Sequence, residues 1–294
     1  MFNPELTTAV MNFAKLFATL PDAELDRPWH WKGHDEGVRF AFFVISRELR
    51  ELSVRLACEL PPAPAVQHIL AQYHSAFLDL QAVLYGVSHE DANLSPSEKD
   101  WPVRRVFAHI LGAEIGFSAM VRYALEGHRA NNWTTEPMSD QDEIRLTGMS
   151  ESDYKSLMKG SFENLLAYHQ TLHPAILAEF STISAQELDL PAAFWEPELF
   201  PIRYRLHRFE AHMRQHTIQI EKTLTAIDLA PDEARRLIRM LFAALSETDG
   251  ILIGADSVPL ETCRGTIDII NTVASEIAPI LASPSSSNLH SRAM

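Results

Sequence analysis

Two histidines of this chain, His212 and His216, are spaced so that both can bind the same metal ion. They lie four positions apart, which on a helix separates them by about 40° around the axis and about 6 Å along it. Two imidazoles placed in this way can bind one divalent ion at distances of about 2.0–2.1 Å. Two ligands make a poor site, so a third must come from another helix. His109, which lies in an apolar helical pattern, is the best candidate.

A purely structural interpretation of these histidines stays open, because most i, i+4 histidine pairs lie on surfaces or at helix ends. The third histidine favours metal binding, since a buried imidazole needs a partner for each ring nitrogen and a metal would satisfy all three rings together. The other ten histidines are expected to face solvent, lie in loops or form local hydrogen bonds: His30, His34, His68, His74, His89, His128, His169, His173, His207 and His290.

Three arginines lie close to these histidines in the sequence. Arg208 precedes His212 by one helical turn and Arg205 by two, while Arg105 precedes His109 by one turn. If they point into the mouth of a pocket, they would bind an anionic substrate or a thiol that bears carboxylates. The alternative is that they pair on the surface with acidic side chains, namely Glu98, Glu114 or Glu210.

The elements that must position these residues are helices, because apolar residues recur at helical spacing along the chain and no segment alternates at period two. Four long helices are expected at 65–86, 101–126, 151–180 and 201–228, enough for an antiparallel up-down bundle. Asp100 and Ser150 are the expected caps of the second and third helix, and Pro174 should kink or break the third. A long polar loop, 127–149, precedes that helix. The predicted fold class is therefore all-α.

Helical segments also flank the bundle on both sides. We expect an N-terminal helical pair in 1–60 (helices at 4–19 and 35–59), the bundle in 65–228, and a C-terminal helical pair in 231–282 (helices at 231–247 and 259–282). The tail, 283–294, is rich in serine and predicted to be disordered. The C-terminal pair could pack on the bundle or form a dimer interface, and the flanks could also add a second bundle.

The composition excludes several classes of function. The net charge is −14, so no broad attraction to nucleic acid or anionic lipid is expected. Only Cys58 and Cys263 are cysteines, which excludes a thiolate zinc site or a disulfide scaffold. The chain has no signal-peptide pattern, no apolar run long enough for a membrane span and no phosphate-loop, GxSxG or HExxH motif. A cytoplasmic protein with a small-molecule substrate is the expectation.

The order of these motifs resembles that of a known superfamily. A helix that begins at Trp101 and carries His109 and Glu114 is followed about a hundred residues later by His212 and His216. This arrangement is similar to the DinB/YfiT-like superfamily over about residues 65–228. The resemblance implies a four-helix bundle in which His109, His212 and His216 bind a divalent metal (zinc, nickel or iron) with positions open for water or substrate. Members include transferases and isomerases that use low-molecular-weight thiols, and others described as hydrolases.

The leading prediction is a metal-dependent enzyme, most similar to a thiol S-transferase, in which the metal activates a low-molecular-weight thiol or water. Because histidine ligates only when neutral, the metal should leave as the pH falls through roughly 6.5 to 5. The alternative is a non-catalytic helical binding module with a structural or vestigial metal site. Its flanking helices, 35–59 and 259–282, would form the interface of a homodimer.

Overall fold

The structure is a computed structural model that describes residues 2–196, 198–255 and 257–283. Within these ranges the chain forms eleven α-helices, two short 3-10 helices and two small antiparallel hairpins. The prediction of an all-α protein is therefore confirmed. The chain divides into two compact units, each described by itself below. The first contains Pro62–Ala230 and 250–255, and the second contains Phe2–Pro61, Pro231–Asp249 and 257–283.

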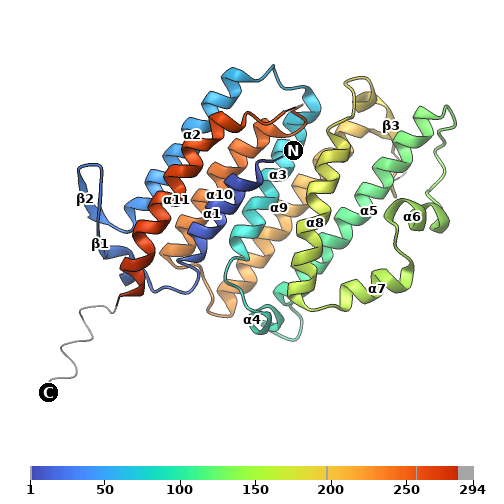
Figure 1. Cartoon of the computed structure of the whole chain (residues 1–294). Coiled ribbons are helices and arrows are strands. Elements are labelled where there is room, and N and C mark those ends of the chain that lie inside the picture. Colours follow the sequence, from blue (N-terminus) through green and yellow to red (C-terminus); the bar gives the residue numbers. More distant parts are fainter. Residues whose placement is uncertain (1, 197, 256, 284–294) are drawn as a thin grey trace. The chain divides into compact units, whose positions relative to one another are not determined.

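Four long helices form the core of the first unit. They are α3 (Ala65–Val83), α5 (Val103–Arg129), α8 (Phe162–Phe180) and α9 (Ile202–Ala226). Helix α9 packs against α3 and α5, and α8 packs against the same two helices (Figure 1). Each helix turns an apolar stripe inward, so that Leu70, Phe107, Leu165 and Leu206 are almost completely buried. This packing brings α5 and α9, which carry the candidate histidines, side by side.

Short elements connect the long helices of the first unit. They are α4 (His89–Asn93), α6 (Asp140–Thr147), α7 (Glu151–Lys159), the 3-10 helix η2 (Glu187–Asp189) and the paired strands β3 (Pro191–Ala192) and β4 (Phe200–Pro201). Helix α6 lies within the segment predicted as a polar loop. The sequence marks the start of this helix with Ser139, whose hydroxyl accepts a hydrogen bond from the Asp142 amide at 3.2 Å. Gly148, with a φ angle of 67°, ends it.

Three local predictions for this unit need correction. The helix expected over 151–180 is two helices, because Gly160 ends α7 and the Ser161 side chain caps α8. Helix α8 does not break at Pro174 but continues through it; burial of its apolar face against α3 and α5 offsets the cost of about 3 kcal/mol for proline in a helix. Pro102, not Asp100, occupies the N-cap of α5. The expected cap of α7 by Ser150 is confirmed, as part of a capping box.

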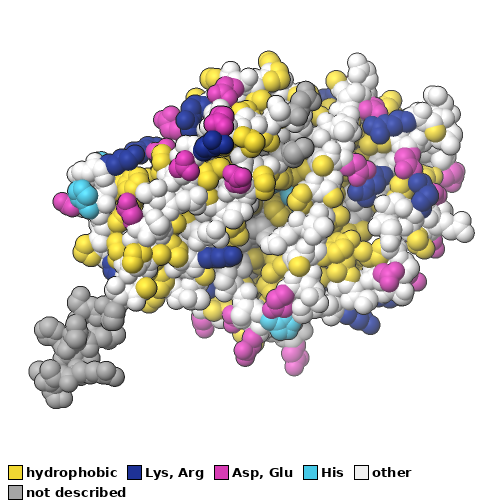
Figure 2. All heavy atoms as spheres, in the orientation of Figure 1, with side chains coloured by type: hydrophobic (Ala, Val, Ile, Leu, Met, Phe, Trp, Pro, Cys, Tyr) yellow, Lys and Arg dark blue, Asp and Glu magenta, His cyan; other side chains and the backbone are white. Residues whose placement is uncertain are grey.

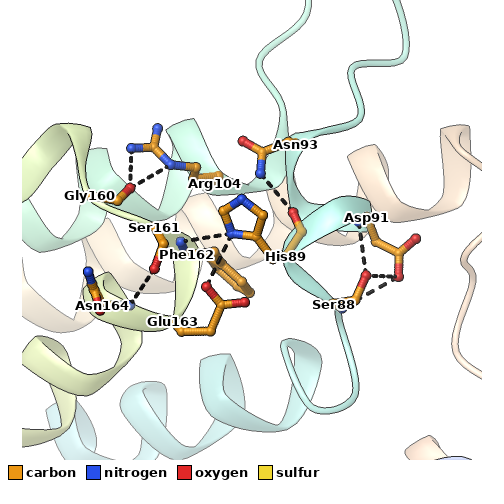
Figure 3. Close-up of polar contacts among 10 residues, drawn as sticks. All are labelled: Ser88, His89, Asp91, Asn93, Arg104, Gly160, Ser161, Phe162, Glu163 and Asn164. Carbon is orange, nitrogen blue, oxygen red and sulfur yellow. Dashed lines mark hydrogen bonds and ion pairs between the residues drawn. The ribbon is translucent and has the colours of Figure 1, made fainter.

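Side-chain contacts hold the start of α8 against α4 and α5 (Figure 3). The Phe162 amide donates to Nδ1 of His89 at 3.3 Å, and Glu163 Oε2 lies 3.1 Å from the same nitrogen. Arg104 of α5 donates two hydrogen bonds to the Gly160 carbonyl, at 3.0 and 2.6 Å. The break between α7 and α8 is thus fixed by two neighbouring helices.

The second unit contains four further long helices and a hairpin. The elements are α1 (Pro4–Lys15), the 3-10 helix η1 (Asp22–Asp26), β1 (Pro28–Trp31), β2 (His34–Gly37), α2 (Phe40–Glu59), α10 (Glu233–Leu252) and α11 (Leu260–Ala282). The hairpin was not predicted: β1 alternates over only four residues, and β2 has no apolar residue to mark a buried face. Lys32 and Gly33 form its tight turn with φ angles of 47° and 90°, the backbone that two-residue hairpins favour.

The flanking segments on both sides of the bundle belong to this one unit. Helix α11 packs against α1 and α2, and the Arg55 guanidinium of α2 donates to the Thr266 hydroxyl of α11 at 3.0 Å. The apolar stripes of α2 and α11 are buried within the chain, including Leu52, Leu56 and Ile270. These are the stripes that the alternative hypothesis assigned to a dimer interface.

Two expectations concern the surface and the tail. None of the described helices is long and apolar enough to cross a membrane. Figure 2 shows acidic and basic side chains intermixed on the face that it displays. The predicted disordered tail lies, apart from Ser283, outside the described residues.

Candidate metal centre

Helices α5 and α9 bring the three predicted ligands together. His109 comes from α5, and His212 and His216 come from successive turns of α9. The Nε2 atoms of His109 and His212 are 3.2 Å apart, and one ring nitrogen from each of the three histidines lies within 4.8 Å of the others. His109 is exposed and the other two are half-buried, so the centre opens to solvent on one side.

The donor set and its spacing fit a divalent ion. Ligand nitrogens at about 2.0–2.1 Å from a tetrahedral ion are about 3.3–3.4 Å apart, close to the 3.2 Å between His109 and His212. His216 is held by its other ring nitrogen, because Nδ1 lies 2.8 Å from Oε1 of Gln219 on the same helix. A hydrogen bond at Nδ1 orients the ring and leaves Nε2 for a metal.

The electrostatics of the centre favour neutral imidazoles, the form that binds metals. Burial, together with the nearby His216, lowers the pKa of His109. Burial also lowers the pKa of His212 to about 4, with smaller contributions from His216, His109 and Arg208 and an opposing one from Glu114. The site therefore resists protonation better than free histidines would.

Two arginines and their aromatic partners flank the centre. The Arg105 guanidinium lies over the Trp101 ring at 4.2 Å, and Trp101 contacts His109 edge-on at 5.7 Å. On the α9 side, Arg208 lies 5.1 Å from the ring of Trp195. Trp195 is 55% exposed, and its ring stacks on Phe117, which in turn contacts His212 edge-on.

Arg205 occupies a different environment from the other two arginines. It is completely buried, and its Nη1 lies 2.7 Å from Oε2 of Glu196. Its guanidinium stacks on Phe194 at 4.2 Å and on Phe200 at 5.0 Å. Arg205, although it lies on α9, is therefore occupied by the residues of the loop that precedes this helix. Its guanidinium is not free to bind a substrate.

The small residues that follow His109 on α5 differ in their surroundings. A side chain at Gly112 would meet the Tyr154 hydroxyl of α7 at 2.5 Å, whereas one at Gly116 would meet nothing within 4 Å. Space for a ligand beside α5 is therefore left at Gly116, and at Gly112 it is taken by Tyr154. No local signal in the sequence pointed to Tyr154, because its position depends on the break between α7 and α8.

Three histidines that were expected to face solvent, lie in loops or form local hydrogen bonds are instead in the core. His74, His169 and His173 are at most 3% exposed; His169 and His173 contact the buried Glu114, and Nδ1 of His74 lies 3.1 Å from Nε2 of His173. Burial alone would raise the pKa of Glu114, but its contacts with His169 and His173 outweigh burial and lower it to about 2. Burial lowers the pKa of His173 to about 3. Glu114 is thus ionised and His173 neutral.

The fold and the histidine centre define a class of protein, the four-helix bundle with a histidine triad suited to a divalent metal. Comparison with known families identifies the class more closely. The profile of the DinB superfamily matches residues 72–220, which include all three histidines. The chain belongs to the DinB superfamily. Comparisons with curated proteins and with solved structures gave no match.

Proposed function

We propose that the protein is a metal-dependent enzyme whose divalent ion is held by His109, His212 and His216. The observation that carries this proposal is the convergence of the three imidazoles from two helices, with their ring nitrogens within 4.8 Å of one another. Three neutral nitrogen ligands suit zinc, nickel or ferrous iron. The exposed side of the centre, at His109, leaves room for a ligand from solution.

The proposed reaction is the transfer of a low-molecular-weight thiol, with hydrolysis as the variant in which water takes its place. A divalent ion bound by three neutral ligands lowers the pKa of a water or thiol in an open position. The chain's own residues would bind and orient the substrate. Arg105 and Arg208 supply positive charge on either side of the triad, and the rings of Trp101 and Trp195 supply flat apolar walls.

The Arg208→Ala variant tests the binding of an anionic thiol. Loss of one charge-assisted hydrogen bond should raise the KM for a carboxylate-bearing thiol about tenfold. The measurement is transfer of the thiol to an electrophile by zinc-loaded protein. His207→Ala, which removes the exposed neighbouring side chain, is the matched control and should change nothing. Equal KM values for Arg208→Ala and the unaltered protein would contradict the proposed role.

The pH dependence of metal binding tests the ligand assignment. Protons compete with the metal for imidazole nitrogens, so the apparent affinity should fall as the pH falls below 6.5, the ordinary pKa of histidine. Burial lowers the pKa of His212 to about 4, so the loss of metal should be complete only at about pH 4. Three ordinary histidines would be expected to release the metal by about pH 5. Competition with a chromophoric chelator measures this affinity. A zinc affinity unchanged between about pH 7 and about pH 4 would exclude histidine ligation.

A further inference from the structure

A cavity of about 420 Å³ lies between α5, α6 and α7 of the first unit. Helix α6 packs against α5, and α7 follows it along the chain (Figure 1). The apolar lining of the cavity consists of four side chains, namely Ile115, Ile144, Met149 and Tyr154. Ile115 is buried, whereas Ile144 and Tyr154 are 46% and 38% exposed. Small-molecule sites are concave, mostly apolar and of about 300–1,000 Å³, so this cavity has the size and lining of such a site.

The cavity lies next to the triad along α5. Tyr154, which lines it, places its hydroxyl 2.5 Å from where a side chain at Gly112 would begin. Gly112 follows the ligand His109 by three positions, which is about one turn. At Gly116, one turn further on, an added side chain would meet nothing within 4 Å. At these two positions α5 has no side chain of its own that would separate the triad from the cavity.

The Tyr154 hydroxyl is available as a hydrogen-bond donor to a molecule in the cavity. It forms no hydrogen bond with any of the residues that the structure describes. Burial raises the pKa of Tyr154, and the charge of Glu143 raises it further, so the hydroxyl keeps its proton near neutral pH. A ligand that displaces water from this hydroxyl must supply an acceptor, because a polar group left without a partner is costly.

The acidic side chains at the cavity select against anions. Three exposed carboxylates line it, namely those of Asp140, Glu143 and Glu151. Glu151 pairs with Lys155, whereas Asp140 and Glu143 have no ion-pair partner in the described part of the chain. Their charge is opposite to that of the two arginines that flank the triad. An anionic molecule is therefore attracted to the arginine side of the centre and repelled from the cavity.

We propose that this cavity binds the second substrate of the transfer, an uncharged electrophile with an apolar body and a hydrogen-bond acceptor. The inference rests on the proposed function, because a thiol transfer needs an electrophile beside the thiol. With an aryl halide, the sulfur forms a bond to the ring carbon and the carbon–halogen bond breaks. The halide leaves, and the proton of the thiol passes to solvent. Tyr154 donates to the acceptor of the electrophile and orients it toward the triad.

Binding to metal-free protein tests the cavity apart from catalysis. Dinitrobenzene is an uncharged, unreactive probe, and dinitrobenzoate adds a carboxylate to the same ring. Full-length protein stripped of metal with a chelator should bind dinitrobenzene in a calorimetric titration. Dinitrobenzoate should displace it only at a concentration at least about 10-fold higher than competing neutral compounds need, because of the carboxylates at the cavity. Absence of dinitrobenzene binding, or displacement by dinitrobenzoate at equal concentration, would overturn the proposal.

Variants of the lining locate the bound probe. Ile144→Asp places a charge on the apolar wall and should weaken dinitrobenzene binding at least about 10-fold. Leu94→Asp is the matched control, because Leu94 is also 46% exposed in the first unit but does not line the cavity, and it should bind the probe normally. Tyr154→Phe keeps the ring and loses the donor, so a loss of about 3–10-fold is expected. Full affinity in both lining variants, with circular dichroism showing them folded, would overturn the location.

Transfer by zinc-loaded protein separates this inference from the proposed function. With chlorodinitrobenzene as the electrophile, Ile144→Asp should raise the KM for the electrophile at least about 10-fold and affect that for the thiol far less, whereas Arg208→Ala should do the reverse. An unchanged KM for the electrophile in Ile144→Asp would remove the cavity from the reaction and leave the enzyme standing. Binding of dinitrobenzene in the cavity without any zinc-dependent transfer would contradict the proposed function and, with it, the role of the cavity as an electrophile site.

Discussion

Replacing His216 with alanine is expected to leave the protein folded but unable to hold the divalent ion that we propose for the triad. His216 is half-buried on α9, and its hydrogen bond partner Gln219 lies on the same helix. Removing it therefore costs little packing but leaves only two ligands, too few for a stable site. We expect affinity for zinc to fall by at least about 100-fold, since loss of an outer partner alone costs about 10–100-fold. Competition with a chelator of known affinity measures the change.

Two further variants on the same helix control this experiment. His207→Ala removes an exposed histidine outside the triad and should leave zinc affinity unchanged. Gln219→Ala keeps all three ligands but removes the oxygen that orients His216, so an intermediate loss of about 10-fold is expected. Full affinity in His216→Ala would show that this histidine is not a ligand. Loss of helical signal in that variant would instead indicate a packing role.

The sequence predicted the triad because its geometry depends mainly on helix periodicity. Two histidines four residues apart must share a face of any helix. Selecting His109 as the third member required knowing which helix packs against α9. Spacing alone could not supply that pairing; the apolar pattern around His109 favoured it, and the resemblance to the DinB superfamily implied the same residue. The packing of α5 on α9 then brings the rings of His109 and His216 to a centroid distance of 4.6 Å.

The same spacing on α8 was misinterpreted because neighbouring residues do not reveal whether a histidine faces the core. His169 and His173 obtain their polar partners Gln81, His74 and Glu114 from α3 and α5, and these lie 55 to 99 positions away along the chain. Both histidines were therefore interpreted like the other histidines outside the triad, as facing solvent, lying in loops or forming local hydrogen bonds. Only the packing of three helices around Glu114 shows that the pair is internal.

The arginines illustrate the same limit over an even shorter distance. Arg205 and Arg208 are three residues apart on α9, yet the side chain of Arg205 is fully buried and that of Arg208 is 35% exposed. The loop between β3 and β4 causes the difference, because Glu196 and the rings of Phe194 and Phe200 enclose Arg205. That loop has no periodic pattern from which its path could be predicted.

Arg205→Met is expected to destabilise the protein by about 2–4 kcal/mol, mainly through loss of buried polar contacts. Besides the ion pair with Glu196, the guanidinium donates to the backbone carbonyls of Ala192 and Glu198, each at 3.3 Å. Methionine keeps much of the apolar stem but satisfies none of these acceptors, and Ala192 is fully buried. Equilibrium unfolding in urea, followed by circular dichroism, measures the change in free energy.

Arg203→Met is the matched control for this prediction. Arg203 lies two residues earlier on α9 and pairs with Asp189 at 2.7 Å, but its side chain is 44% exposed. An exposed pair of this kind contributes at most about 1 kcal/mol, so the variant should unfold almost like the unaltered protein. The contrast separates a buried anchor of the loop from an ordinary surface charge. If Arg205→Met instead raised the KM for an anionic thiol while leaving the unfolding free energy unchanged, Arg205 would belong with Arg208 in the substrate site, and the loop would have to open to admit the substrate.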